Sequence, residues 1–570
     1  MAAAAAAIVL SAACGGSNGS VTDSTEFVSR SGGSVLNNDT TAATDPATAS
    51  TELSTQPTSR QPVSSGSNSC ESVRSAGSHL EDLTVTIGVD NALLGMRGHA
   101  VAAGDVNGDG FVDLFVGGFA DRDPESYQVR GADGPAPDRL LLGSASGFAL
   151  DASFPDVFGR TSGAAFADLD NDGDLDLIIA RNPRESERGA APSEVMINDD
   201  GRFSTATVLD DSRGLRSIGV LDYDADGLLD LFMVEDRFRG GSSLLLANRG
   251  QLEFENVTAS AGLPTDLAGL GVAAADLDRS GSPDLFIAGD NRLFSNTDGQ
   301  FSEVHGPFAW DYFGDEDDVA GVSVGDINGD GLLDLVVGQH FNSTIDAGAL
   351  VPIRVYLNAG GSGAGLTFTD ATAESQIAAF PTKAPHVEAI DLDGDGNVDI
   401  LTSASAGNGS VPAVLLNRGG DQPTFETPDG IGAKQYWVAG AIVDVDGDPD
   451  PEIFLVEWEP AIGSRLFDAV ERSGDFVSVK VGPTGAAGVG SVVDVFVAGS
   501  SDLVQTVPIV ASTGYGSGSA PVARIGVGQT AAVDIVVERP WGQPEIRITG
   551  VAAGSNITVD PDGSWACTRP

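Results

Sequence analysis

The stretch that decides the fold is DVNGDGFVD, which runs from Asp105 to Asp113. Side chains that carry oxygen occupy its first, third, fifth and ninth positions, and a glycine occupies the sixth. Six further segments repeat the pattern: DLDNDGDLD (168–176), DYDADGLLD (222–230), DLDRSGSPD (276–284), DINGDGLLD (326–334), DLDGDGNVD (391–399) and DVDGDPDPE (444–452). Seven copies at intervals of about 50 to 65 residues are typical of a repeat protein.

The arrangement of oxygens within each copy favours calcium. Ca²⁺ takes roughly six to eight oxygen ligands, and a tight loop can supply them from side chains 1, 3, 5 and 9 and from the backbone carbonyl of position 7. Glycine at position 6 permits the sharp turn. A single copy is also compatible with a metal-free turn rich in Asp and Asn. Seven copies in register favour the metal, because the carboxylates would otherwise repel one another.

We therefore expect up to seven bound Ca²⁺, held by the oxygen ligands of the seven loops. The fourth loop has Ser280 in place of a third carboxylate, beside a bulky Arg279, and the seventh has Pro449 in place of the glycine. We expect weaker binding at these two. The expected ligands are Asp105, Asn107, Asp109, Phe111, Asp113; Asp168, Asp170, Asp172, Asp174, Asp176; Asp222, Asp224, Asp226, Leu228, Asp230; Asp276, Asp278, Ser280, Ser282, Asp284; Asp326, Asn328, Asp330, Leu332, Asp334; Asp391, Asp393, Asp395, Asn397, Asp399; and Asp444, Asp446, Asp448, Asp450, Glu452.

The flanks of each loop read as strands. Short apolar runs, such as VAAGD before the first loop and LFVGG after it, bound a turn of Gly and Asp, which indicates a hairpin. A further strand, turn and strand follow, as in RLLLGSASGFALDAS (139–153), so each unit has four strands. Units of four strands at this period predict an all-β fold, a seven-bladed β-propeller over residues 79–474. The seventh unit lacks a fourth strand, and we expect LTVTIG (83–88) to complete it and close the ring.

The remaining segments predict an exported chain. Residues 1–14 resemble a bacterial lipoprotein signal, in which Cys14 becomes the lipidated residue; an ordinary cleaved signal and an apolar start without function are the alternatives. Residues 15–78 are rich in Ser, Thr and Gly and predict a disordered tether. Residues 475–567 predict a small β-sandwich or barrel with Gly-rich turns. Cys70 and Cys567 lie at the two ends of the ordered region, so we expect a disulfide; the alternative is two free thiols.

The charge of the chain limits its partners. Net charge is −52, and the seven loops hold 27 of the 82 acidic residues. Nucleic acid is therefore not expected as a partner, because phosphate binding needs basic patches. The excess negative charge suits solubility in a salty medium that contains calcium.

The repeats resemble the FG-GAP (or VCBS) calcium repeats of integrin α-subunit propellers and of bacterial surface proteins. Residues 476–560 resemble the ASPIC/UnbV domain that often follows such repeats. The matching segments there are GPTGAAGVGS after VSVKV, TGYGS (513–517), ARIGVG (523–528) and PWG (540–542). Arg539 stands where that family usually has Trp, and Trp541 follows the proline instead. The whole chain looks like a bacterial relative of the cartilage acidic protein family. This resemblance implies an extracellular protein of the binding or adhesion type, with no catalytic activity assigned.

The sequence is compatible with three functions. The first is a non-catalytic, calcium-stabilised monomer at the cell surface, lipid-anchored or secreted, that recognises an extracellular protein or glycan. Trp310, Tyr312 and Phe313 are candidates for a patch that stacks on a sugar or contacts a protein; the alternative is ordinary packing between blades. The second is a calcium-dependent polysaccharide lyase or hydrolase. The third is a structural module of the cell envelope. The sequence has no HExxH, GxSxG or GxxxxGK motif, and we expect His99 and His386 to be structural residues in inner strands.

Overall fold

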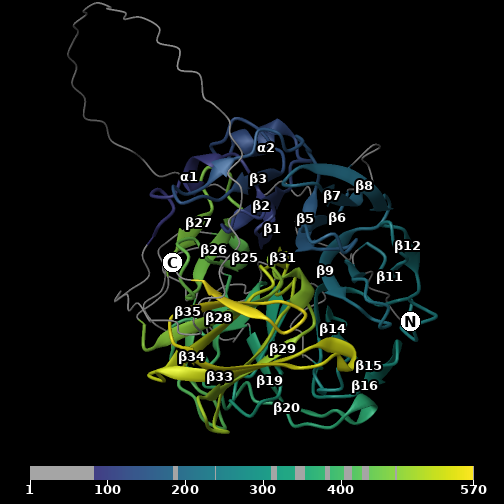
Figure 1. Ribbon diagram of the computed structural model, residues 1–570. Helices are drawn as coiled ribbons and strands as arrows, with labels where there is room; N and C mark the ends of the chain where they lie inside the picture. Colours follow the sequence, from purple (N-terminus) through teal and green to yellow (C-terminus); the bar gives the residue numbers. More distant parts are fainter. Residues whose placement is uncertain are drawn as a thin grey trace, which may run out of the picture. The chain divides into compact units, whose positions relative to one another are not determined.

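The computed structural model describes residues 82–183, 191–237, 239–309, 318–340, 353–378, 385–403, 414–426, 436–468 and 472–568. The fold is all-β, as predicted, and is built from repeated antiparallel sheets (Figure 1). Helices are short, as in α1 (Val89–Ala92) and α2 (Pro124–Gln128). Among the described residues, no helix is long and apolar enough to cross a membrane.

Successive sheets follow one another along the chain, and each calcium-type loop joins the first two strands of its sheet. The strands of the first three sheets are β1 (Gly98–Gly104), β2 (Asp113–Gly118), β3 (Arg139–Leu142), β4 (Ala149–Leu150); β5 (Thr161–Ala167), β6 (Asp176–Arg181), β7 (Ser193–Asn198), β8 (Phe203–Asp210); and β9 (Leu215–Leu221), β10 (Asp230–Glu235), β11 (Leu244–Asn248), β12 (Phe254–Asn256). Those of the next four are β13 (Gly269–Ala275), β14 (Asp284–Gly289), β15 (Arg292–Thr297), β16 (Gln300–Val304); β17 (Asp318–Gly325), β18 (Asp334–His340), β19 (Ile353–Asn358), β20 (Phe368–Asp370); β21 (Val387–Ile390), β22 (Asp399–Thr402), β23 (Val414–Asn417), β24 (Phe425–Glu426); and β25 (Trp437–Val443), β26 (Glu452–Glu457), β27 (Arg465–Phe467).

The first strand of each sheet is the most crowded, because these strands converge where neighbouring sheets meet. Every residue of β1, β5, β9, β13 and β25 is buried, and their sequences are rich in Gly and Ala. An added Cβ at Gly163 would lie 2.0 Å from the carbonyl oxygen of Arg216, and one at Gly271 would lie 2.0 Å from that of Ala320. Larger side chains at these positions would therefore push neighbouring sheets apart.

The last sheet packs against the first, which is the arrangement expected of a propeller. One apolar cluster joins Val101 and Val116 of the first sheet to Ala441 and Phe454 of the seventh. The number of blades stays a prediction, since several connecting segments lie outside the described residues.

The expectation that residues 83–88 form a strand that closes the ring is wrong in the extent of that strand. Asp82 forms a single antiparallel bridge with Phe467, and the backbone of Leu83 donates to Leu466 at 3.0 Å. Residues 84–88 then form turns that lead into α1, and Gly88 adopts a φ of 80°. The N-terminal segment thus contacts the incomplete sheet, but only through its first residues. The chain turns away because Ile87 and Phe148 pair by backbone hydrogen bonding at the edge of the first sheet.

The C-terminal segment forms a sandwich of one mixed sheet and one antiparallel sheet. One has the order β32 (Ala523–Gly528), β28 (Asp475–Val481), β35 (Ser555–Val559) and β36 (Trp565–Thr568), and the other has β30 (Leu503–Pro508), β29 (Val492–Val497), β33 (Ala532–Glu538) and β34 (Ile546–Ala552). Valine and isoleucine side chains from both sheets form a separate core. The remaining strand, β31 (Ser517–Gly518), leaves the sandwich and pairs in parallel with Val101 and Ala102 of β1 (Figure 1).

Candidate metal centres

Each loop is folded so that its acidic side chains turn inward. In the first, the two carboxylate oxygens of Asp105 accept the backbone N–H groups of Asp109 at 3.0 Å and Gly110 at 2.9 Å. Asp109 in turn accepts the N–H of Phe111 at 3.0 Å. Gly110 has a φ of 92°, a left-handed conformation that glycine adopts without strain. The bonds donated by positions 6 and 7 recur in the second, fifth and sixth loops. Backbone geometry therefore orients these oxygens before any ion arrives.

Carboxylate oxygens from positions 1, 3 and 9 come together, as the sequence predicts. Groups whose ligand atoms all lie within 4.8 Å of one another include Asp222, Asp224 and Asp230 in the third loop. Equivalent groups occur in the fourth, sixth and seventh loops, and positions 1, 3 and 5 form one in the second. Hard oxygen donors at this spacing suit Ca²⁺. The number of ions bound stays a prediction.

The electrostatics of the clusters also favour a cation. Burial, together with neighbouring carboxylates, raises the pKa of Asp113 and Asp176 to about 7 and that of Asp230 to about 8. The carboxyl groups of Asp284 and Asp334 are more deeply buried, and their pKa values are raised well above the usual range for the same reason. Without a counter-charge, these groups would be protonated near neutral pH. A divalent cation supplies that charge, so the residues fit the expected ion.

The sequence analysis missed an asparagine that ties each of the second to sixth loops to the preceding one. The side-chain amide of Asn248, at the end of β11, donates to the carbonyl oxygen of Leu169 in the second loop at 2.7 Å and to that of Leu229 in its own loop at 3.2 Å. Its backbone N–H donates to Asp230 at 2.8 Å. Asn198, Asn296, Asn358 and Asn417 repeat the contact with the preceding loop. The signal was present, since an Asn ends the third strand of each of these units.

The fourth and seventh loops differ from the others as their sequences predict. In the fourth, the neutral hydroxyl of Ser280 stands in place of a carboxylate and lies 3.0 Å from the hydroxyl of Ser282. In the seventh, Arg472 forms ion pairs with Asp450 and, at 3.8 Å, with Asp448. A fixed positive charge beside these carboxylates competes with a metal ion, which supports the expectation of weaker binding there.

The C-terminal sandwich covers the loops. Trp541, in the 3-10 turn Pro540–Gly542, has a φ of 58° and spans two of them: its backbone N–H donates to Gly281 of the fourth loop at 2.6 Å, and its indole N–H donates to Asp222 of the third at 3.0 Å. Arg279, also in the fourth loop, pairs with Asp494 of β29 at 2.6 Å. The Trp and the unusual Arg of the loop are thus both docking residues.

Other loops meet the sandwich in the same way. Asn556 donates to the carbonyl oxygen of Gly447 in the seventh loop at 2.7 Å, and the backbone N–H of Gly528 donates to that of Gly394 in the sixth at 2.8 Å. An added Cβ at Gly526 would lie 1.8 Å from Oδ2 of Asp391, so only glycine fits beside that ligand. Burial lowers the pKa of Lys480, and the carboxylate of Asp105 partly offsets this effect.

A loop of the sandwich, residues 509–522, enters the space between the inner strands. Tyr515 is fully buried there, and its neighbours Leu270, Ala320 and Val438 come from three different sheets. The backbone of Gly514 exchanges hydrogen bonds with Val322 of β17. His386 accepts the N–H of Tyr515 at 3.3 Å. His99 lies 3.3 Å from its hydroxyl. Both histidines therefore contact the inserted loop, consistent with a structural role.

Other expected sites fall partly outside the described residues. Cys567 lies in β36, whereas Cys14 and Cys70 lie in segments that the structure does not describe. Lipidation and the disulfide therefore stay predictions. Trp310, Tyr312 and Phe313 also lie outside the described residues.

Comparisons with known proteins support the repeats. The family described as FG-GAP-like repeat matches residues 168–233, 222–287, 276–337 and 391–455. These repeats are typical of extracellular proteins. A comparison with curated protein sequences finds no match. The ASPIC/UnbV resemblance of the sandwich stays a prediction.

Solved structures that partly resemble this chain belong to proteins of very different kinds. They include BBS1N in complex with ARL6DN (14% identity, TM-score 0.41, covering 70% of this chain and 98% of that one) and the exotype rhamnogalacturonan lyase YesX (12%, 0.37, 66% and 72%). The V. cholerae biofilm matrix protein Bap1 is a third (12%, 0.31, 86% and 76%). Similarity at this level does not assign a function.

Proposed function

We propose that the chain is an exported, calcium-stabilised binding protein of the adhesion type, which recognises a protein or glycan outside the cell and has no catalytic activity. The observation that carries the proposal is the coupling of the acidic loops to a second domain. The sandwich hydrogen-bonds to the backbone of loops whose carboxylates need a cation. Ca²⁺ then fixes the whole assembly and presents a rigid surface, as suits an extracellular recognition scaffold.

The proposal includes attachment through a lipid at Cys14 and a disulfide between Cys70 and Cys567. Mass spectrometry of the protein purified from its native membrane fraction tests both features at once. We expect a diacylated or triacylated peptide that begins at Cys14 and a non-reduced peptide pair that joins the two other cysteines. An unmodified N-terminus that precedes Cys14 would contradict the anchor, and free thiols would contradict the disulfide.

Calcium dependence of stability is the first test. Extracellular sites bind Ca²⁺ with Kd values of roughly 0.1–1 mM. A site at tenfold its Kd stabilises the fold by about 1.4 kcal/mol, so seven sites contribute on the order of 10 kcal/mol. We therefore expect the Tm to fall strongly in EDTA and to recover with CaCl₂ but not with MgCl₂. An unchanged melting curve in EDTA would contradict a structural role for the metal.

Binding is the second test. The chain from residue 70 onward is assayed on a glycan array and on whole cells, with Ca²⁺ and again with EDTA. Calcium-dependent binding that saturates would identify the class of ligand. Calcium-dependent stability without any binding would instead favour a structural module of the envelope, and turnover of a polysaccharide would contradict the non-catalytic assignment.

A further inference from the structure

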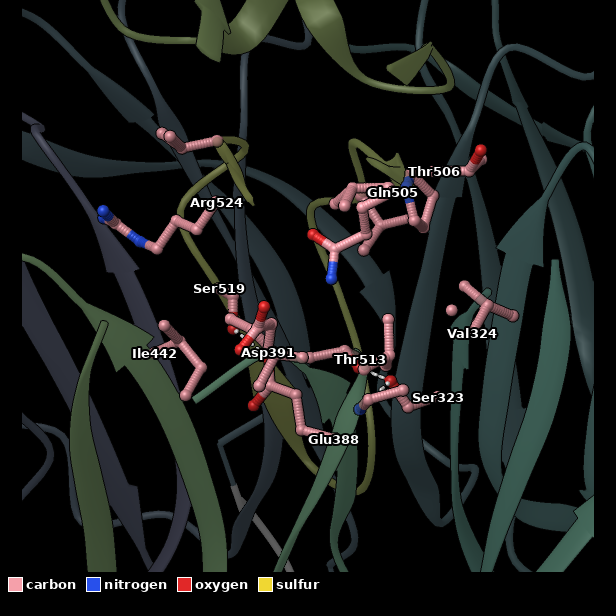
Figure 2. Close-up of a pocket in the computed structure, with 18 of the residues that line it drawn as sticks. Ser323, Val324, Glu388, Asp391, Ile442, Gln505, Thr506, Thr513, Ser519 and Arg524 are labelled. Atoms are coloured by element: carbon pink, nitrogen blue, oxygen red, sulfur yellow. Dashed lines mark hydrogen bonds between the residues drawn. The ribbon is translucent and has the colours of Figure 1, made fainter. Parts of the chain in front are cut away.

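A cavity with both polar and apolar lining lies between the sandwich and the inner strands of the propeller-like domain. Its volume is about 70 Å³, and its lining comes from β17, β21 and β25 on one side and from β30, β32 and the inserted loop on the other. Figure 2 shows Gln505 of β30 with its amide group directed into this space, above Asp391 and Ser519.

Several buried polar atoms in this lining lack a hydrogen-bond partner. Gln505 is 2% exposed, and neither its Oε1 nor its Nε2 is paired. Glu388 is 6% exposed; its Oε1 accepts the hydroxyl of Ser519 at 3.1 Å, whereas its Oε2 accepts no hydrogen bond and lies 3.5 Å from Nε2 of His386. A buried amide that makes no hydrogen bond is costly. The lining therefore favours a ligand that both donates and accepts hydrogen bonds.

The ionisable side chains of the lining determine whether a charged or a neutral ligand fits the cavity. Asp391 belongs to the sixth calcium loop, and its two oxygens accept the N–H groups of Gly394 and Gly396 at 2.7 Å. The other two ionisable lining groups each lie beside another side chain: a guanidinium nitrogen of Arg524 is 4.0 Å from Asp444, and Oε2 of Glu388 is 3.5 Å from Nε2 of His386. Since neither group faces the cavity without a neighbouring polar side chain, the lining favours a neutral ligand over an ion.

The size and the apolar part of the lining narrow the ligand further. One water needs roughly 10–15 Å³ of such space, so the cavity holds about five or six non-hydrogen atoms. Val324, Ile442 and Val522 supply aliphatic surface beside the polar groups. A chain of carbons that carries a hydroxyl on each carbon matches both features, because each hydroxyl can donate to Glu388 or bond in either direction with Gln505.

We propose that this cavity is a binding site for a small neutral polyol of glycerol size. Its hydroxyl groups contact Gln505 and Glu388, and its carbon chain lies against the aliphatic side chains. The inference is independent of the proposed function, because it concerns a small molecule held between the two domains and not the macromolecule recognised at the surface.

Saturation-transfer NMR and calorimetry on the full, calcium-loaded chain test the site, with glycerol as the probe. We expect saturable binding of glycerol to the wild-type protein and a loss of at least tenfold in affinity in Gln505→Leu, which keeps a similar volume and removes both unpaired atoms. Gln543→Leu, at an exposed glutamine, is the matched control and is expected to bind as the wild type does. Circular dichroism and the calcium-dependent Tm confirm that each variant folds.

Three results would overturn the proposal. Absence of saturable binding to the wild type would leave the cavity as a hydrated void, as would equal binding to Gln505→Leu. Preference for ammonium over glycerol would show that the site selects a cation. Should Gln505→Leu fail to fold, Val324→Ile narrows the cavity without touching its polar groups, and undiminished affinity in that variant would equally count against the site.

Discussion

The hydroxyl of Tyr515 lies 3.3 Å from Nε2 of His99, although the two residues are 416 positions apart in the chain. Nδ1 of His99 lies 3.2 Å from the carbonyl oxygen of Ser162, so Nδ1 carries the proton and Nε2 accepts the tyrosine hydroxyl. Both side chains are buried, and the rings meet edge to face at 5.3 Å. The inserted loop is thus part of the core of the first domain and not a surface connection.

Truncation of Tyr515 is expected to be severe. Tyr515→Ala removes a fully buried ring between sheets and should reduce the free energy of unfolding by about 3–5 kcal/mol. Tyr515→Phe keeps the ring and loses one hydrogen bond, so a loss of about 1 kcal/mol is expected. Urea unfolding in saturating calcium measures both. Equal stability of the Ala and Phe variants would show that the ring does not pack as described.

Stability should fall as the pH drops below the ordinary pKa of histidine. Burial, and then the positive charges of Arg216 and Arg160, hold the pKa of His99 well below its usual 6.5. The unfolded chain therefore binds a proton that the folded protein does not, and the free energy of unfolding rises with pH in this window. The contribution of His99 is complete above about pH 6.5 and is lost progressively below it.

The variant His99→Gln isolates this effect, because it removes the titrating group and can still accept the tyrosine hydroxyl. Its free energy of unfolding in excess calcium should depend less on pH between 5 and 7 than that of the wild type, a range chosen around the ordinary pKa of histidine. Identical slopes in the two proteins would mean that His99 titrates in the folded state as it does in the unfolded chain.

The metal-free protein should show the opposite dependence in its acidic loops. The pKa of Asp230 is raised to about 8 by burial and by its neighbouring carboxylates. The folded metal-free protein therefore binds protons that the unfolded chain has released, and its stability falls as the pH rises from about 4 towards 8. Calcium binding displaces those protons, so calcium should stabilise more strongly at pH 8 than at pH 5.5, with proton release on binding.

Asp230→Asn tests the cause of that dependence. The amide removes the titrating group but can accept only one of the two backbone N–H groups that Asp230 accepts, from Tyr223 and Asn248. The metal-free variant should therefore be less stable than the wild type at low pH, should lose less stability as the pH rises towards 8, and should gain less from calcium. Calorimetric titrations with Ca²⁺ in buffers of different ionisation enthalpy count the protons released. A proton count that is unchanged by the substitution would place the linkage at other residues.

The hydrogen bonds that the side chain of Asn248 donates to two loops should contribute a measurable part of the stability. Asn248→Ala leaves the carbonyl oxygens of Leu169 and Leu229 without their buried donor. Unpaired buried acceptors cost about 1–3 kcal/mol each, so a loss of several kcal/mol is expected in calcium. Gln128→Ala, at an exposed residue with one long hydrogen bond of 3.4 Å, serves as the control and should change little. A small effect of Asn248→Ala would indicate that water replaces the amide.

The sequence predicts the loops because their ligands are local. Positions 1 to 9 of each loop are close in the chain, and the hydrogen bonds that Asp105 accepts from the backbone of Asp109 and Gly110 depend on nine residues alone. The role of Asn248 was not predicted because its partner Leu169 belongs to another repeat. The course of residues 83–88 depends on tertiary contacts in the same way, since their apolar pattern fits a strand but their partners produce turns.

The inserted loop could not be predicted for a related reason. TGYGS has the composition of a surface turn, and β31 has only two residues, so nothing local marks it as buried. Its position follows from the gap between inner strands rich in Gly and Ala, which a tyrosine ring fills. The same holds for Trp541, whose partners Gly281 and Asp222 lie in two different loops.

Docking of the sandwich through Trp541 should depend on calcium. Trp541→Ala removes the indole hydrogen bond to the backbone of Asp222 in the third loop, and it leaves the backbone N–H that donates to Gly281 in the fourth. In the presence of calcium, we expect the backbone amides of these two loops to exchange hydrogen faster in the variant than in the wild type. The loss of stability should be about 1–3 kcal/mol. In EDTA the wild type should approach the variant, because loops without the ion no longer offer a fixed carbonyl. Arg547→Ala, at a side chain that pairs only with the nearby Glu545 in the described part of the chain, is the control. Faster exchange confined to the sandwich itself, with the loops unaffected, would show that Trp541 stabilises its own domain and does not couple it to the metal sites.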